Sequence, residues 1–315
     1  MAARFAVLER QVEDALAAGG LGRGVVGRDV LQSAVDQTLA AFAGARRGSV
    51  RAALARLRTG VGGGAGLEAD PLRRLLEALY RYWWRVEAVG LDRVPSSGRV
   101  LLVANRGGAL LPYEALMIRV ALATRHPAHR TSSPLVDEWL ADSVLVGAIL
   151  ARAGIVRTTS AARRLLVRDE VVIVCPEGQR AVAKSFRERY RLRPFGRGAF
   201  ARLAIETRTP IVPVAVVGAE EVQPVLARLD LPGRLLGLPT LPLTPTFPWL
   251  GLAGLVPLPT KWTLIAGDPL DVPARHAPGD ATDPAAVGRL RDQVRERLQA
   301  LVLEGLRRRR SLFLG

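Results

Sequence analysis

The chain has 315 residues, 49% of them hydrophobic, so it is long enough for one large domain or two ordinary ones and can bury a sizeable core. Its 45 Lys and Arg residues against 29 Asp and Glu give a net charge of +16, which suits nucleic acid, an anionic membrane face or acidic metabolites. Aromatic residues make up only 5%, and no zinc-finger, RNP-type or helix-turn-helix pattern is present, so a nucleic-acid partner is not expected. Cys175 is the only cysteine, which excludes an intramolecular disulfide and suits a reducing cytoplasm.

Residues 1–65 are predicted to form an N-terminal helical appendage. The stretches "LERQVEDALAAG" and "LQSAVDQTLAAFAG" repeat apolar residues at helical spacing, and "GVGGGAG" then interrupts the pattern as a flexible joint. The first positions include acidic residues and lack the basic-then-apolar order of a signal peptide, so secretion is not expected.

The remainder, 66–315, is predicted to form one α/β domain. The stretch "PLRRLLEALYRYWWRVEAVGL" indicates a helix that runs into a first strand, with Tyr80, Trp83 and Trp84 packing the helix onto a sheet. Apolar strands and helices then alternate, which favours a mostly parallel central sheet that is covered by helices on both faces. The strands are expected in "RVLLVAN", "VVIVCPEG", "PIVPVAVVG" and "WTLIAGD", and the helices over 113–124, 134–152, "AARRLLVRD", "GAFARLAIET" and 284–308.

An apolar, Pro-rich insertion is predicted over 235–260. Its prolines forbid a regular membrane-spanning helix, so we expect it to lie against an apolar surface. It carries Phe247, Trp249 and Leu250, and a separate stretch, "RAVAKSFRERYRLRPFGR", is rich in arginine. Together these features predict a face that contacts anionic lipid head groups, although a solvated loop also explains the arginines.

Four ordered segments carry a family resemblance: "ANRGGALLPYEAL", "AGIVRTTSAARRLL", "VVIVCPEGQRAVAKSFRERYRLRPFGRGAFARLAIE" and "PIVPVAVVGAEE". They resemble the blocks of the glycerolipid and lysophospholipid acyltransferase family, in the branch of bacterial diacylglycerol acyltransferase-like proteins, over about 78–272. The resemblance implies a glycerol-3-phosphate acyltransferase-like fold and acyl transfer from acyl-CoA or acyl-carrier protein to a lysophospholipid or glycerolipid hydroxyl. It also implies no bound cofactor or metal, and a cytoplasmic protein peripheral on the inner face of the membrane.

The catalytic block of this family pairs a histidine base with an acid, and the matching positions here are Arg106 and Glu114. A guanidinium stays protonated, so Arg106 cannot accept the hydroxyl proton. Three alternatives remain: Glu114 acts as the base, His126 or His129 folds back into the site, or the protein is a non-catalytic pseudo-acyltransferase that binds lipid or acyl chains and regulates a partner. Both histidines are otherwise expected in a solvated loop. We also expect Arg106 to pair with Glu114 and to fill the space of the lost dyad.

Other candidate substrate-binding residues follow from the resemblance. Glu177, Gly178 and Arg180 match a block that grips the phosphate or polar head group of the acceptor, although an internal ion pair at a strand end also explains Glu177 and Arg180. Arg157 matches an arginine that faces the acceptor, and Pro213 matches a position that shapes the acyl pocket, although a buried strand explains Pro213 equally well. The central prediction is that the turns at 106 and 176–180 converge on one pocket for a lipid head and an acyl tail. Cys175 is expected to be a buried strand residue.

Overall fold

A computed structural model of the chain describes residues 71–107, 109, 111–137, 140, 150, 154–182, 184–229, 241–244, 256–311 and 313. The predicted N-terminal appendage and the aromatic part of the Pro-rich insertion, with Phe247, Trp249 and Leu250, lie outside these residues. Within the described ranges, no helix is both long enough and apolar enough to cross a membrane.

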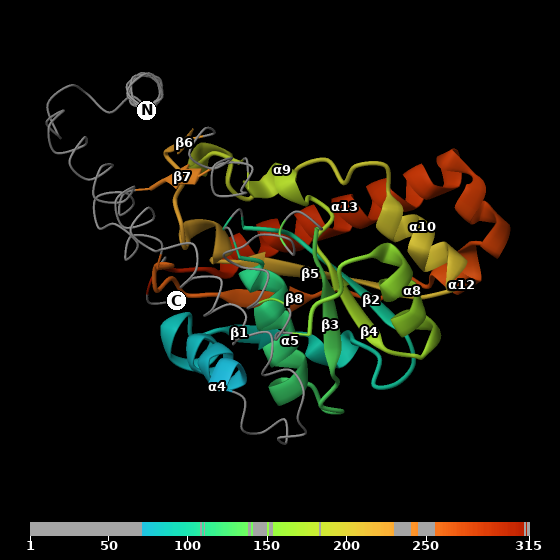
Figure 1. Cartoon of the computed structure of the whole chain (residues 1–315), viewed down its shortest axis with the longest axis horizontal. Helices are drawn as coiled ribbons and strands as arrows, with labels where there is room; N and C mark the ends of the chain where they lie inside the picture. Colours follow the sequence, from blue (N-terminus) through green and yellow to red (C-terminus); the bar gives the residue numbers. More distant parts are fainter. Residues whose placement is uncertain are drawn as a thin grey trace, which may run out of the picture.

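A central sheet runs through the described part of the chain (Figure 1). Its strands are β1 (Glu87–Val89), β2 (Val100–Ala104), β3 (Ser132–Leu135), β4 (Val171–Val174), β5 (Ile211–Val217) and β8 (Thr263–Ala266). They lie in the order β1-β8-β5-β2-β4-β3. β5, β2, β4 and β3 are parallel to one another, whereas β8 is antiparallel to β5 and parallel to β1. This mostly parallel sheet, flanked by helices, confirms the predicted α/β fold class.

The central strands are buried on both faces because helices cover both sides of the sheet. Every residue of β2, β4 and β5 is buried. Along β2, Val100 and Leu102 point into one apolar layer, while Leu101 and Val103 point into the other. This two-sided burial explains why the strands read as continuous apolar runs rather than as alternating patterns.

The first face of the sheet is covered by α4 (Pro71–Ala78), the π-helical turn η2 (Leu79–Trp83) and α5 (Tyr113–Arg125). Trp84 is fully buried and stacks on Trp262 with ring centroids 4.6 Å apart. Tyr80 is also buried, as predicted, but the prediction for Trp83 is wrong because its side chain is 38% exposed. The indole N–H of Trp83 bonds the Pro257 carbonyl at the surface instead (2.9 Å).

The second face is covered by α8 (Thr159–Val167), α10 (Ala199–Glu206) and α13 (Pro284–Arg308). The bounds of α13 agree with the predicted helix over 284–308. Asp283 fixes its start, because the carboxylate accepts from the first backbone N–H groups and Pro284 follows at the first helical position. Short elements complete the chain: η3 (Leu91–Arg93), α9 (Gln179–Val182), η4 (Phe186–Glu188), η5 (Ala219–Glu221), the hairpin β6 (Ala227–Leu229) and β7 (Leu241–Leu243), α12 (Val272–Arg275) and η7 (Pro278–Thr282).

The start of one predicted helix is wrong. The sequence predicted a helix over 134–152, but Ser132–Leu135 forms β3, which pairs in parallel with β4. Pro134 lacks a backbone N–H, and it is tolerated because β3 is the last strand of the sheet. The short polar run "SSPL" carries no strand pattern of its own, so only tertiary pairing with β4 identifies it as a strand.

Candidate active site

The candidate site begins where β2 ends. The side chain of Asn105 donates to the Val216 carbonyl (2.9 Å) and accepts from the Val216 N–H (2.7 Å). These are the bonds that one more strand residue would make, so the ladder between β2 and β5 continues past the last residue of β2. The following turn therefore starts from a fixed position at the C-terminal edge of the sheet.

Two buried carboxylates hold the turn itself. The backbone N–H of Arg106 donates to Oε1 of Glu177 (2.9 Å), and that of Gly107 donates to Oε1 of Glu114 (2.6 Å). A Cβ at position 107 would lie 2.5 Å from Glu114 Oε1 and 2.7 Å from the Ala219 carbonyl. Glycine is therefore required at position 107 by the close approach of these groups.

Glu177 joins the two predicted turns. Its side chain is fully buried, and besides Arg106 N it accepts from Arg193 N through Oε2 (2.7 Å). The Lys184 ammonium lies 3.4 Å from the same Oε2 and 3.1 Å from Oε1 of Glu220. Both oxygens of Glu177 are thus occupied from inside the protein, but its ion-pair partner is Lys184 and not Arg180, which the internal ion-pair alternative had named.

A pocket of about 210 Å³ lies where the turns after β2 and β4 meet. Its polar wall includes Arg106, Asp137, Thr159 and Cys175, and its apolar wall includes Leu135, Phe195, Phe200 and Leu203. The two turns therefore converge on one pocket with a charged side and an apolar side. Ligand sites commonly measure about 300–1,000 Å³, so this volume holds only part of a lipid substrate.

The structure contradicts the expected pairing of Arg106 with Glu114. Among the described residues, the ion pair of Arg106 is with Asp137 (Nη1 to Oδ2, 3.8 Å), and none joins it to Glu114. The reason is that Glu114 turns toward the backbone of Gly107. Burial raises the pKa of Glu114, while the positive charge of Arg106 and the bond from Gly107 N oppose that rise.

Glu114 is fully buried and is not among the described residues that line the pocket. Its position behind the turn does not suit direct removal of a proton from a substrate. Its Oε1 is held by Gly107, whereas its Oε2 has no hydrogen-bond partner among the described residues. Glu114 therefore lies where it could orient a side chain at position 106 rather than contact the substrate itself.

Neither His126 nor His129 is among the described residues that line the pocket. His126 follows the last residue of α5, a helix of thirteen residues that is about 18 Å long. It therefore lies at the opposite end of this helix from the turn at 106. The prediction of a solvated His126 is wrong, because it is 1% exposed, donates from Nε2 to the Val94 carbonyl (2.9 Å) and accepts at Nδ1 from Ala128 N (3.1 Å). His129 is exposed and donates from Nδ1 to the Ala123 carbonyl (3.1 Å).

Of the other candidate residues, Gly178 lines the pocket, whereas Arg157, Arg180 and Pro213 are not among the described lining residues. Gly178 lines the pocket with φ +53°, and a Cβ there would meet the Asp137 carboxylate at 3.1 Å. Arg180 is exposed and donates to the Pro194 carbonyl (3.4 Å), and Arg157 is also exposed. Pro213 is buried on β5 outside the described lining of the pocket.

Two pocket residues had no functional signal in the sequence. Asp137 lies just beyond β3, where the sequence predicted the interior of a helix, so its approach to Arg106 could not be anticipated. Cys175, expected inside a strand, follows the last residue of β4 and contributes to the pocket wall. Burial raises the pKa of the Cys175 thiol, which disfavours the thiolate form.

The fold and the site together define an α/β protein with a half-apolar pocket at the C-terminal edge of its sheet. The sequence model of the Acyltransferase family matches residues 85–217. The chain is 42% identical over 245 residues to the uncharacterised protein Rv0502 of Mycobacterium tuberculosis, covering 78% of this chain and 68% of that protein. The uncharacterised protein ML2427 of Mycobacterium leprae is likewise 42% identical over 245 residues, covering 78% and 66%. The chain belongs to the Acyltransferase family.

A solved structure is also similar. It is PlsC, the 1-acyl-sn-glycerophosphate acyltransferase of Thermotoga maritima, with a TM-score of 0.48 and 18% sequence identity. The similarity covers 76% of this chain and 80% of that chain.

Proposed function

We propose that this chain binds an acyl-CoA or acyl-carrier-protein donor and a lysophospholipid or glycerolipid acceptor, and that it transfers the acyl chain slowly. The observation that carries the proposal is the single pocket formed by the turns after β2 and β4, with Arg106 at the position of the family's base. The substrate class comes from the family, and the slow rate comes from the residue at 106.

The reaction needs an acceptor for one proton. The acceptor hydroxyl oxygen forms a bond to the thioester carbon, the carbon–sulfur bond breaks, and the hydroxyl proton leaves with the thiol after passing through a base. A guanidinium cannot take that proton, and the loss of a general base costs about 10²- to 10⁴-fold in rate. Positioning of the two substrates against each other accounts for the residual rate.

Arg106 has a different role in this proposal. Its side chain is 3% exposed, lines the pocket and lies near Asp137, so it presents a fixed cation to the substrate. A planar guanidinium offers paired donors to a phosphate or to a developing oxyanion. We therefore assign Arg106 to binding the anionic part of the substrate, with Gly178 allowing close approach on the facing turn.

A position at the inner face of the membrane is part of the same proposal. Support comes from the exposed arginines of the 187–191 segment, since each basic residue near an anionic membrane contributes about 1 kcal/mol. The division into a helical appendage (1–65) and an acyltransferase-like domain (66–315) also remains a proposal.

A second candidate is favoured by the position of Glu114. Because this carboxyl is buried and does not line the pocket, it can orient a side chain at position 106 but is not placed to take the hydroxyl proton itself. A non-catalytic protein that binds lipid or acyl chains and regulates a partner would keep the same pocket.

The variant Arg106→His tests the proposal. A histidine at 106 restores a proton acceptor, and Oε2 of Glu114 is available to accept its ring N–H. We expect transfer of labelled acyl chains from acyl-CoA to lysophosphatidic acid to rise by about 10²- to 10⁴-fold. Arg106→Gln is the matched control, because it removes the cation without adding a base, and circular dichroism verifies that all three proteins fold.

The outcomes separate the two candidates. If folded Arg106→His binds the lysolipid but transfers no faster than Arg106→Gln, the non-catalytic candidate replaces the proposal. If the unmodified protein already transfers as fast as Arg106→His, the residue at 106 does not limit the rate, and the base must be sought elsewhere.

A further inference from the structure

A second and larger hollow lies between the 187–191 segment and the end of α13. It has a volume of about 680 Å³ and shares no lining residue with the pocket at Arg106. Glu221 is the one acidic residue among those lining it. Its basic lining consists of Arg187, Arg189, Arg191, Arg309 and Arg310.

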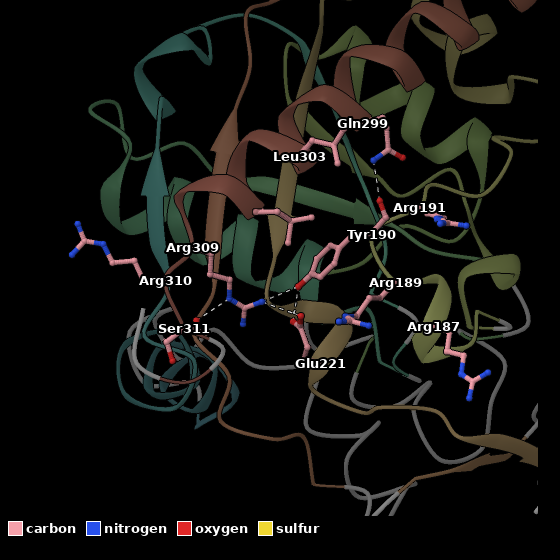
Figure 2. A pocket seen from close by; sticks show the side chains of 11 residues that line it. Arg187, Arg189, Tyr190, Arg191, Glu221, Gln299, Leu303, Arg309, Arg310 and Ser311 are labelled. Atoms are coloured by element: carbon pink, nitrogen blue, oxygen red, sulfur yellow. Dashed lines mark hydrogen bonds and ion pairs between the residues drawn. The ribbon is translucent and has the colours of Figure 1, made fainter. Parts of the chain in front are cut away.

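Tyr190, Glu221 and Arg309 are hydrogen-bonded to one another at the floor of this hollow and form what we call the bonded core (Figure 2). The Tyr190 hydroxyl donates to Oε2 of Glu221 (2.5 Å) and accepts from Gly218 N (3.0 Å) and from Nη1 of Arg309 (3.0 Å). The same Nη1 donates to Oε1 of Glu221 (2.9 Å). Glu221 therefore neutralises Arg309, and these bonds hold the floor in one geometry.

Arg187, Arg189 and Arg191 form one wall of the hollow, called the arginine wall, and hydrogen bonds from α13 fix the backbone of this segment. Gln299 of α13 accepts from Leu192 N (3.0 Å) and donates to the Tyr190 carbonyl (2.9 Å). Tyr190 and Leu192 are buried, and the alternate residues Arg189 and Arg191 are exposed. Figure 2 shows Arg187, Arg189 and Arg191 on one side of the bonded core and Arg310 on the other.

The positive charge of this wall is not compensated within the described part of the chain. The nearby carboxylates are already engaged: Glu188 pairs with Arg193 (2.7 Å) and Glu221 with Arg309 (2.9 Å). None of the ion pairs among the described residues includes Arg187, Arg189, Arg191 or Arg310. Arg189 lies over the Phe186 ring, 4.4 Å from its centroid, a contact that positions the guanidinium and leaves its charge in place.

We propose that this hollow binds a phosphate-bearing ligand. Several guanidinium groups around a preformed concave surface suit the tetrahedral oxygens and multiple charges of a phosphate, because each offers paired N–H donors. The volume lies within the range of small-molecule sites and also admits a lipid head group. The shared chemistry is the phosphate, which either an anionic phospholipid or a soluble phosphorylated molecule supplies. The proposal goes beyond acyl transfer and does not depend on it.

The test compares two variants with equal loss of charge. The wall variant removes three positive charges from one side of the hollow by combining Arg187→Gln, Arg189→Gln and Arg191→Gln. Arg163→Gln, Arg164→Gln and Arg202→Gln together form the control, since all three are exposed and none lines the hollow. The probes are inorganic pyrophosphate, measured by titration calorimetry, and phosphatidylcholine vesicles with or without phosphatidic acid, measured by flotation at low and high salt.

We expect the unmodified protein to bind at least one probe in a salt-sensitive manner, and the wall variant to bind it at least about tenfold more weakly. The control variant should retain most of the binding. Loss of pyrophosphate binding identifies a soluble phosphate ligand, whereas loss confined to phosphatidic acid vesicles identifies a lipid head group. If neither probe binds, or if both variants weaken binding equally, the hollow is not a phosphate site and the proposal is overturned.

Discussion

The turn at position 106 is held through the backbone N–H groups of residues 106 and 107. Glu177 accepts the N–H of Arg106, and every residue type except proline supplies a backbone N–H at this position. The turn can therefore keep its geometry while the side chain changes from a proton acceptor to a cation. A substitution at position 106 can therefore change the chemistry of the pocket without loss of the turn.

Gly107 should be intolerant of any side chain. A Cβ there would approach Glu114 Oε1 and the Ala219 carbonyl at 2.5–2.7 Å, so Gly107→Ala should lower the free energy of unfolding by about 1–3 kcal/mol. Gly288 in α13 is the matched control, because a Cβ there meets nothing within 4 Å and alanine favours helix. Gly288→Ala should raise the free energy of unfolding by about 0.5–1 kcal/mol. Urea unfolding checks both, and an unchanged Gly107→Ala would contradict the packing described.

At the scale of elements, a buried cluster connects η5 to the turn after β4. Lys184 lies between Glu220 of η5 and Glu177, so two carboxylates share one ammonium. Burial, opposed by Lys184, raises the pKa of Glu220 to about 7. The folded protein then holds a proton on Glu220 that the unfolded chain releases at about pH 4.3, the ordinary pKa of a glutamate side chain.

The stability should accordingly fall as pH rises from about 4.3 to about 7, and level off above that range. Between pH 5 and pH 8, we expect the free energy of unfolding to fall by on the order of 2 kcal/mol more for the unmodified protein than for Glu220→Gln. Urea unfolding at both pH values measures this difference. Glu206→Gln, at an exposed position in α10, should keep the slope of the unmodified protein. Equal slopes for the unmodified protein and Glu220→Gln would show that Glu220 does not hold this proton.

The elements predictable from sequence were those whose own residues decide their structure. β2, β4 and β5 are continuous apolar runs, and α13 begins with an Asp–Pro cap, so local pattern was sufficient. β3 was missed because "SSPL" becomes a strand only through pairing with β4, and Asp137 was missed with it. The convergence of the two turns was predictable from the family order of the blocks. The direction of Glu114 was not, because it depends on a close contact with the backbone of Gly107.

For the whole molecule, the order of the strands predicts a gradient of local stability. β2 is paired on both sides, by β5 and β4, whereas β3 lies at the edge of the sheet. Backbone amides of β2 should therefore exchange with solvent at least about tenfold more slowly than those of β3, because edge strands open in smaller local fluctuations. Hydrogen exchange followed by mass spectrometry measures both segments. Equal protection of β3 and β2 would mean that the edge strand opens only when the whole sheet unfolds.

The side-chain amide of Asn105 makes the two bonds that one more strand residue would make. The framework of the turn therefore does not depend on the side chain at position 106. Some arginine codons become histidine codons through a single base change, so one point mutation can exchange the two side chains at 106 while Asn105 and Glu177 still hold the loop. In evolutionary terms, a protein with histidine at this position and one with arginine there can be a single mutation apart, and the change can occur in either direction.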